Sequence, residues 1–229
     1  MGDRGLGLAA VDPYKRRMTT FDEALDFERI AAAPVVQAPF PHAIISDSIL
    51  PDAARALAGA LPQVTEHGSL RFNEIDRSPE LDALIAELES DRFRALMEQK
   101  FDIDLAGLTI FHTYRGMMRK QDGVIHTDTP AKTLTILLYL NPPGDEEKVP
   151  LRLLNSSSDL DDYFAEVPST MGTMLLFKVT DNCWHGHKSM VGPRHSLQLN
   201  YLSGIEMQGH ERLRRRIAKL KRTFLGAKG

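Results

Sequence analysis

His126 and Asp128 are separated by one residue in the segment "GVIHTDTP", residues 123–130. Alternate side chains of an extended chain leave the same face, so this imidazole and this carboxylate can converge on one metal ion. A chain with eight histidines also produces such a pair by chance, and an ordinary surface pair is the alternative. The segment therefore offers part of a metal site, and the remaining ligand must come from elsewhere.

A second histidine for this site is available in the segment "WHGH", residues 184–187, which contains His185 and His187. Two histidines and one carboxylate on one side of a metal leave the opposite positions open, a set that suits non-haem Fe(II). Arg194 follows, and its guanidinium fork could bind a carboxylate held on the same metal. The residues alone leave the choice between His185 and His187 open.

Short strands must position these residues. After about residue 105 the chain reads as apolar segments separated by turn residues: "LTIFHTYR", "GVIHTD", "KTLTILLYLN", "PLRLL", "GTMLLFKV" and "RHSLQLNYL". Because side chains alternate along a strand, each of two strands divides into two faces. In the first strand, one face carries Leu134, Ile136, Leu138 and Leu140, and the other carries Thr133, Thr135, Leu137 and Tyr139. In the second strand, Leu197, Leu199 and Tyr201 oppose Arg194, Ser196, Gln198 and Asn200. We expect the polar faces to line a small barrel around a ligand.

Helices dominate the first half of the chain. We expect a short helix at 21–30, a strand ending near Ser46, a helix after Pro51, and one long helix over 78–100 with Ser78 as its N-cap. Helices followed by strands indicate an α+β fold, with a sandwich or small barrel covered on one side by the N-terminal helices.

Composition is that of an ordinary globular protein, with 229 residues, 42% hydrophobic content and a net charge of -3. The single cysteine, Cys183, excludes an internal disulfide and is compatible with a reducing compartment. No apolar segment approaches the roughly 18 residues of a membrane span, and the first residues lack the apolar core of a secretory signal. We expect a cytoplasmic protein.

The two ends of the chain differ from the middle. Residues 1–18 are predicted as a flexible arm, 19–204 as the catalytic domain, and 205–229 as a basic amphipathic helix with eight Lys or Arg against two Glu. An apolar stripe formed by Leu213, Ile217, Leu220 and Phe224 could pack on the barrel. A weak contact with a membrane surface or another anionic partner is the alternative.

The order His-x-Asp, distal histidine and arginine nine residues later resembles the 2-oxoglutarate- and Fe(II)-dependent oxygenases, most closely their prolyl 4-hydroxylase-like branch. The resemblance covers about residues 40–202, and two segments carry it: "YRGMMRKQDGVIHTDTPAKTLTILLYLN" and "WHGHKSMVGPRHSLQLNYL". It implies a double-stranded β-helix, a jelly-roll or cupin-like barrel.

The resemblance also implies roles. The spacing of nine residues to the arginine selects His185 over His187, so that His126, Asp128 and His185 would bind Fe(II). Arg194 would bind the far carboxylate of 2-oxoglutarate, and the family positions of a tyrosine and a serine fall on Tyr139 and Ser196. O2 is the implied second cosubstrate, and ascorbate is a candidate stimulant.

Comparison with the family's pattern at three positions bears on the activity that the resemblance implies. Val149 and Pro150 stand where the family often has two glycines, so the family's loop geometry and any substrate role of this loop do not carry over to this chain. Asn200 replaces the second arginine of the nucleic-acid-repair branch, and no specific nucleic acid is expected. Halogenating members lack the metal carboxylate, whereas Asp128 is present, which implies hydroxylation or a related oxidation.

The resemblance implies hydroxylation of an unactivated C–H bond with release of succinate and CO2. The substrate, a small molecule or a peptidyl group, and the oligomeric state are left open. Two other functions are compatible with the residues: a zinc-dependent hydrolase, and a non-catalytic cupin-like module that binds a metal or ligand.

Several neighbouring residues receive less specific expectations. His187 and His195 are expected to lie behind the metal ligands or at the surface, and not to bind the metal. For His195 the reason is strand parity, which turns its side chain away from Arg194. His112 and Tyr114 are expected in the core, and the role of Arg152 stays open.

Overall fold

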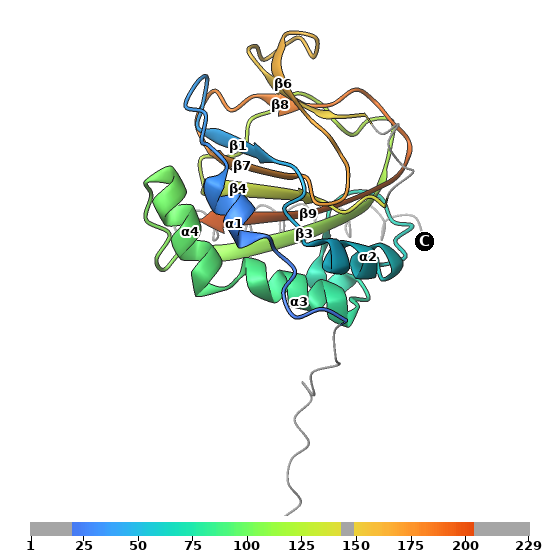
Figure 1. Ribbon diagram of the computed structural model, residues 1–229. Coiled ribbons are helices and arrows are strands. Elements are labelled where there is room, and N and C mark those ends of the chain that lie inside the picture. Colours follow the sequence, from blue (N-terminus) through green and yellow to red (C-terminus); the bar gives the residue numbers. More distant parts are fainter. Residues whose placement is uncertain (1–19, 143–148, 204–229) are drawn as a thin grey trace, which may run out of the picture.

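The computed structural model describes residues 20–142 and 149–203, which form two antiparallel sheets with helices on one side (Figure 1). The helices are α1 (Phe27–Ala32), α2 (Pro51–Gly59), the 3-10 helix η1 (Phe72–Glu74), α3 (Pro79–Leu88) and α4 (Asp91–Phe101). The predicted arm at 1–18 and the predicted helix at 205–229 lie outside the described residues. Among the described helices, none has the length and apolar character required to cross a membrane.

The larger sheet has six strands in the order β1-β7-β4-β9-β3-β2. Their bounds are β1 His42–Ile45, β2 Leu70–Arg71, β3 Thr109–Met118, β4 Lys132–Tyr139, β7 Met174–Lys178 and β9 Gly192–Leu202. The smaller sheet has the order β6-β5-β8, with β5 Leu151–Leu154, β6 Tyr163–Val167 and β8 His185–Gly186. Figure 1 shows the helices on one face of the larger sheet and the smaller sheet on the other. The predicted α+β class and the position of the N-terminal helices are confirmed.

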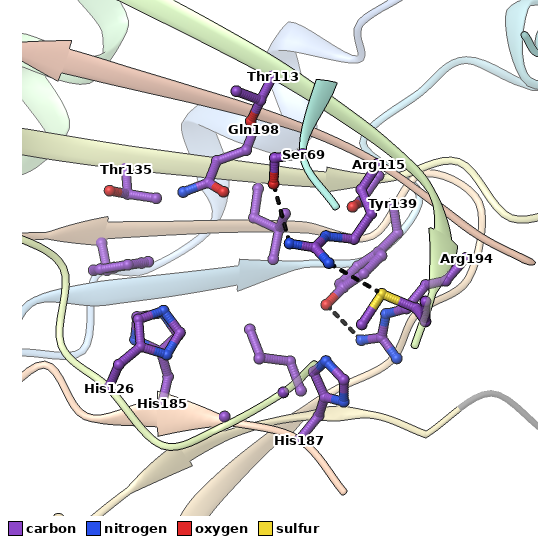
Figure 2. A pocket seen from close by; sticks show the side chains of 17 residues that line it. Ser69, Thr113, Arg115, His126, Thr135, Tyr139, His185, His187, Arg194 and Gln198 are labelled. Carbon is purple, nitrogen blue, oxygen red and sulfur yellow. Dashed lines mark hydrogen bonds between the residues drawn. The ribbon is translucent and has the colours of Figure 1, made fainter. Parts of the chain in front are cut away.

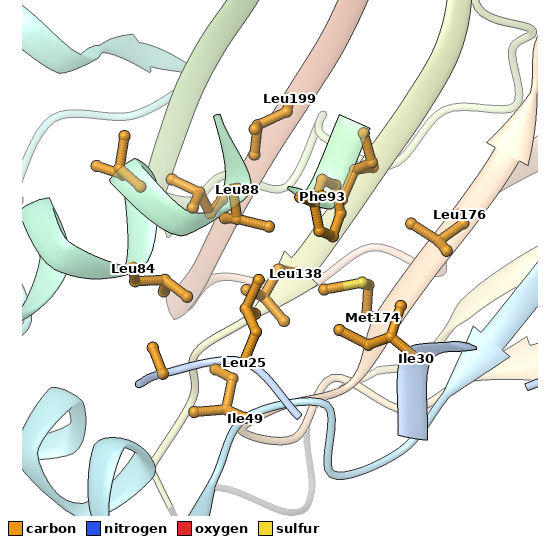
Figure 3. Close-up of a cluster of buried hydrophobic side chains, with 14 of the residues drawn as sticks. Leu25, Ile30, Ile49, Leu84, Leu88, Phe93, Leu138, Met174, Leu176 and Leu199 are labelled. Carbon is orange, nitrogen blue, oxygen red and sulfur yellow. The ribbon is translucent and has the colours of Figure 1, made fainter. Parts of the chain in front are cut away.

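The main hydrophobic core lies between the helices and the larger sheet (Figure 3). Leu138 of β4 and Leu199 of β9 are fully buried there against Leu84, Leu88 and Phe93 of the helices. Burial of such side chains contributes about 25 cal/mol for each Å² of apolar surface removed from water. The predicted division of β4 and β9 into an apolar and a polar face is confirmed, because the apolar residues of both strands point to the helices.

A smaller apolar cluster joins the two sheets at one side of the barrel. It consists of buried residues from both sheets and from the segments that lead into them: Phe40, Tyr139, Leu151, Leu153, Val167, Leu175, Phe177 and Cys183. This cluster closes the barrel beside β7, so that the polar side chains of β3, β4 and β9 surround the remaining interior space.

The single helix predicted over 78–100 is wrong, since two helices occupy this segment. Ser90 breaks it: its hydroxyl donates to the carbonyl of Glu87 at 2.6 Å and accepts from the amide of Phe93 at 3.1 Å. Serine at this position is a strong N-cap, and it begins α4 in a new direction. The continuous apolar periodicity concealed this break.

The prediction of a strand at 123–128 is also wrong in part. The only β-pairing of this segment is an isolated bridge between His126 and His185, although the carbonyl of Gly123 also accepts a hydrogen bond from the amide of His187. β6 is also absent from the strands that the sequence predicts. β6 is largely exposed at Tyr163, so its pattern lacks the apolar alternation of a half-buried strand.

Glu87 of α3 fixes the N-terminal segment to the helical layer. Its two carboxylate oxygens accept hydrogen bonds from the backbone amides of Ala24 at 2.7 Å and Leu25 at 2.8 Å. Both of these residues are fully buried, so their amides have little access to water. Burial raises the pKa of the Glu87 carboxyl, and the two amide hydrogen bonds oppose this shift.

Replacing Glu87 by alanine should lower the free energy of unfolding by about 2 kcal/mol, because two amides lose their acceptor in a poorly solvated position. Glu87→Gln, which keeps one carbonyl acceptor, should lie between this variant and the parent. Urea denaturation followed by circular dichroism measures the difference. The control is Glu28→Ala, which removes an exposed carboxylate on α1 and should leave the free energy of unfolding almost unchanged. Equal stability of the Glu28 and Glu87 variants would contradict this account.

Candidate metal centre and its cavity

The two histidines of the predicted metal site lie side by side because their backbones pair. The amide of His126 donates to the carbonyl of His185 at 3.0 Å, and the reverse hydrogen bond measures 2.9 Å. The ring centroids are 4.3 Å apart. An irregular segment before β4 is thereby joined to β8 of the smaller sheet, and the two imidazoles face the same space (Figure 2).

Backbone carbonyls orient both imidazole rings. Nδ1 of His126 lies 2.9 Å from the carbonyl oxygen of Val124, and Nδ1 of His185 lies 2.8 Å from that of Cys183. Since a carbonyl oxygen only accepts, each Nδ1 must carry the proton. The Nε2 atoms are left with lone pairs, which is the tautomer that a metal ligand requires.

Asp128 is buried and held at both carboxylate oxygens. Lys132 donates to Oδ1 at 2.7 Å, and the hydroxyl of Thr135 donates to Oδ2 at 2.6 Å. Burial alone would raise the pKa of Asp128, but the charge and hydrogen bond of Lys132 and the hydrogen bond of Thr135 outweigh it and hold the pKa below its ordinary value. The carboxylate is therefore ionised at neutral pH.

His126, Asp128 and His185 form the one group of three potential metal ligands found in the described residues, with ligand atoms within 4.8 Å of one another. Two ligands at about 2.1 Å from one ion span at most about 4.2 Å, so small side-chain rotations suffice to place an ion between them. Burial, followed by the nearby His126, lowers the pKa of His185 to about 4, and the ring is neutral. Two imidazole nitrogens and one carboxylate fit Fe(II) or Zn(II).

A cavity of about 140 Å³ opens beside these ligands, inside the barrel (Figure 2). Its wall includes His126 and His185, the polar side chains of the larger sheet, and two arginines, Arg115 and Arg194. None of the described residues that line it is acidic. A cavity with two guanidinium groups and no carboxylate attracts anions.

Arg194 is the deeper of the two arginines and is only 2% exposed. Its Nη2 donates to the hydroxyl of Tyr139 at 2.8 Å, and its Nη1 donates to the carbonyl oxygen of Val149. Within the described ranges, no carboxylate pairs with it. A buried cation with only neutral partners is costly unless an anion joins it, so this position is prepared for an anionic group.

Strand register places a row of three residues across the cavity wall. Ser196 of β9 lies opposite Arg115 of β3 on one side and opposite Tyr139 of β4 on the other. The predicted partners of Arg194 therefore come together, since Tyr139 contacts it directly and Ser196 lies two residues along the same face. Arg115 was missed by the sequence reading, although the alternation of β3 could have revealed it.

His187 lies in the cavity wall and is buried, which differs from a surface position. Its Nδ1 lies 2.8 Å from the carbonyl oxygen of Lys188, and its amide donates to the carbonyl of Gly123 at 3.0 Å. Gly123 has a φ of +91°, and a Cβ there would lie 2.4 Å from the His187 ring. Glycine is required because both the backbone conformation and the close contact exclude a side chain.

The remaining predicted residues lie away from the cavity. His195 points to the helical side, where its Nδ1 is 2.7 Å from the hydroxyl of Tyr114, and parity is confirmed. His112 stacks on Phe72 with ring centroids 4.9 Å apart. Arg152 pairs with Glu166 at 2.8 Å and with Asp161, so it holds the smaller sheet together.

Two antiparallel sheets that enclose an anion-attracting cavity, with a His-x-Asp and distal-His group at its side, define a barrel protein with a candidate mononuclear metal centre. No protein-family model and no curated protein sequence matches the chain. Solved structures do match it, and prolyl 4-hydroxylases are among them.

A prolyl 4-hydroxylase from Phytophthora capsici aligns with a TM-score of 0.52 at 14% identity, over 82% of this chain and 69% of that one. A Pseudomonas putida prolyl-4-hydroxylase gives 0.49 at 17% identity, over 76% and 90%. A viral collagen prolyl hydroxylase from Paramecium Bursaria Chlorella virus-1, in complex with 2OG, gives 0.47 at 12% identity, over 71% and 96%. The chain has the fold of the Phytophthora enzyme, and the resemblance seen in the sequence is confirmed at this level.

The choice between the two distal histidines can be tested by metal binding. His185→Ala should weaken Mn(II) binding by at least about 100-fold, since even residues that only orient metal ligands contribute about 10- to 100-fold. His187→Ala, the matched control two residues away, should bind Mn(II) as the parent does. Water proton relaxation measures both affinities under anaerobic conditions. A larger loss in the His187 variant would reverse the assignment.

Proposed function

We propose that the protein is an Fe(II)- and 2-oxoglutarate-dependent oxygenase that hydroxylates a C–H bond of a small-molecule or peptidyl substrate and releases succinate and CO2. The observation that carries this proposal is that one cavity contains both the candidate metal ligands and Arg194, a buried cation without a carboxylate partner in the described residues. A metal centre that also binds a dicarboxylate would use both the metal ligands and Arg194.

His126, Asp128 and His185 would hold Fe(II). The carbonyl oxygens of Val124 and Cys183 keep the two imidazoles in the required tautomer, so no rearrangement of protons is needed before metal binding. Three ligands on one face leave the other positions open, as a metal that binds both a cosubstrate and O2 requires.

Lys132 and Thr135 hold the carboxylate of this ligand set in place. Both donate to the Asp128 carboxylate, at 2.7 and 2.6 Å, and keep it ionised despite burial. The ion pair with Lys132 also disperses the negative charge of Asp128 before a metal arrives.

Arg194 would bind the carboxylate of 2-oxoglutarate that is remote from the metal. Its planar fork matches a carboxylate, and the Tyr139 hydroxyl at 2.8 Å fixes the guanidinium orientation. Ser196 adds a hydroxyl on the same face of β9. All three side chains project from paired strands, which makes their geometry rigid.

When bound, Fe(II) and 2-oxoglutarate supply the oxidising chemistry: one oxygen atom of O2 enters succinate as CO2 is lost, and the other enters the substrate C–H bond. The protein positions the reactants and limits water. Leu137, Leu151 and Phe177 form the apolar part of the cavity wall, which lowers the local dielectric and strengthens the ion pair of Arg194 with its carboxylate.

Residues 19–204 would form the catalytic domain, and the proposed site uses only residues between 124 and 196. O2 is a cosubstrate in this proposal, and ascorbate would act by keeping the iron reduced. The absence of a specific nucleic-acid partner and the anionic or membrane contact of residues 205–229 stay predictions.

Succinate release provides the direct test. The purified protein with Fe(II), ascorbate and 2-oxoglutarate should form succinate without an added substrate, because oxygenases of this class turn over slowly in uncoupled form. Asp128→Ala should abolish this activity by removing the anionic metal ligand. Measurement of succinate by mass spectrometry decides the question. A variant that binds iron and turns over like the parent would refute the ligand assignment.

Succinate formation also separates the proposed oxygenase from the two competing functions, since neither of them produces succinate. A zinc hydrolase should in addition contain Zn(II) after anaerobic purification, which metal analysis measures. This function would leave Arg194 without a role. A non-catalytic binding module should be stabilised by 2-oxoglutarate but should also form no succinate.

Arg194→Lys should raise the Kd for 2-oxoglutarate by about 30-fold or more, because lysine keeps the charge but loses the two parallel hydrogen bonds of the fork. Isothermal titration of the Mn(II)-loaded protein with 2-oxoglutarate measures the change. The control, Arg92→Lys, alters a guanidinium that stacks over Phe27 at 3.7 Å on the helical layer, and it should leave the Kd unchanged. Equal Kd values for both variants would contradict this role of Arg194.

A further inference from the structure

The proposed function accounts for only one of the two arginines in the cavity. Arg115 also lines it, from β3, and its side chain is 27% exposed, whereas Arg194 is nearly fully buried. Ser69, which contacts Arg115, is an exposed residue immediately before β2. Arg115 therefore lies on the side of the cavity that is open to solvent.

The partners of Arg115 leave much of its guanidinium available. Nη2 donates to the Ser69 hydroxyl at 3.0 Å, and Nη1 lies 3.6 Å from the sulfur of Met118, a weak acceptor. Asp122 lies 3.3 Å from Nη1 as an ion pair, but Arg119 also engages its carboxylate, through its amide at 2.8 Å and its side chain at 3.2 Å. Two cations thus share one anion, and the five N–H donors of Arg115 exceed its acceptors.

Charge balance leads to the same result. Fe(II), the Asp128 carboxylate, the 2-oxoglutarate dianion and the Arg194 cation would together carry no net charge, and Lys132, which is paired with Asp128, would add one positive charge. Of the described residues that line the cavity, none is acidic, so Arg115 would be the cation that remains on the wall. Its charge lies close enough to that of Arg194 for the two to repel each other, and a further anion would relieve this repulsion.

Cavity size limits what can reach Arg115. The volume of about 140 Å³ is close to that of an engineered cavity of about 150 Å³ that binds one benzene. One small cosubstrate would fill most of it. A second molecule could therefore insert only one of its ends into the cavity. Arg115, at the open side, is placed to bind that end.

We propose that Arg115 binds an oxyanion, a carboxylate or phosphate, of the primary substrate, so that the enzyme acts on an anionic molecule. This inference rests on the proposed function, because it assigns Arg194 to 2-oxoglutarate. Ser69 and Gln198 flank the same part of the wall and supply neutral hydrogen-bonding groups beside the guanidinium. Arg115 is thus a specificity-determining residue, whereas Arg152, which the sequence left open, is already paired with two carboxylates.

A paramagnetic binding experiment tests this proposal without knowledge of the substrate. The protein is loaded with Mn(II) and saturating 2-oxoglutarate, so that the metal and Arg194 are occupied. Trifluoroacetate, trifluoromethylphosphonate and the neutral trifluoroacetamide are then added, and the line width of each fluorine signal is measured. Bound Mn(II) broadens the signal of a probe only when that probe binds near the metal.

We expect one or both anions to be broadened more than the amide, and the stronger of the two identifies carboxylate or phosphate as the preferred group. Arg115→Gln should weaken the binding of that anion by about ten-fold or more, since a charge-assisted hydrogen bond is lost. Arg115→Lys, which keeps the charge without the fork, should weaken it less. Both variants should keep the parent Kd for 2-oxoglutarate.

Two control variants separate binding from a structural role. Asp122→Asn removes the ion-pair partner of Arg115 and should leave anion binding intact or stronger, whereas a purely structural pair predicts the same loss in both variants. Arg92→Gln removes one positive charge on the helical layer and should have no effect. Thermal denaturation of each variant shows whether it is folded, and Arg115→Lys serves if Arg115→Gln is not.

Three results would overturn the inference: equal broadening of anions and amide by the parent, unchanged anion binding in Arg115→Gln, or a rise in the Kd for 2-oxoglutarate as large as that of Arg194→Lys. The last result would assign Arg115 to the cosubstrate. Failure of the parent to bind Mn(II) or 2-oxoglutarate is seen separately, by water proton relaxation and calorimetry, and would refute the proposed function itself.

Discussion

The register of β9 between β3 and β4 is the constraint on which the site depends. This strand pairs with both neighbours, and the pairing sets Ser196 beside Tyr139 on one side and beside Arg115 on the other. Side chains alternate along a strand, so a shift by one residue would move Arg194 and Ser196 into the apolar core and Leu197 into the cavity. The burial of Leu197 and Leu199 under the helices prevents that shift. The hydrophobic core thus fixes the polar site, although none of its described buried residues lines the cavity.

A second constraint is the difference in rigidity between the two ends of the cavity. Arg194, Ser196 and Tyr139 belong to long paired strands, whereas His126 and Asp128 precede β4 in a segment with a single backbone bridge. Hydrogen bonds compensate for this: carbonyl oxygens hold the imidazoles, and Lys132 and Thr135 hold the carboxylate. The candidate metal end is therefore held by side-chain and bridge contacts, and the candidate cosubstrate end is held by the sheet itself.

Much of this arrangement could be predicted from the sequence, because parity along a strand needs no tertiary information. Alternation alone predicted the two faces of β4 and β9. It also predicted that His195 points away from Arg194. Positions that depend on partners distant in sequence could not be predicted in the same way. The inward position of His187 depends on Gly123, and the end of α3 depends on the two hydrogen bonds of Ser90. β6 was missed because its exposed residues, Tyr163 and Glu166, fall on opposite parities, so the strand shows no alternation of apolar and polar residues.

The β5–β6 hairpin of the smaller sheet is a closed unit. Leu151 and Val167 pair at the base of the β5–β6 hairpin, so the intervening chain leaves and returns at one place. Asp161 at its tip pairs at 2.8 Å with Lys188, which follows β8. Loop closure varies only slowly with length, so insertions in this tip cost little stability. Insertions at the hairpin tip would therefore leave the register of the larger sheet unchanged, because the pairing of Leu151 with Val167 closes the hairpin at its base.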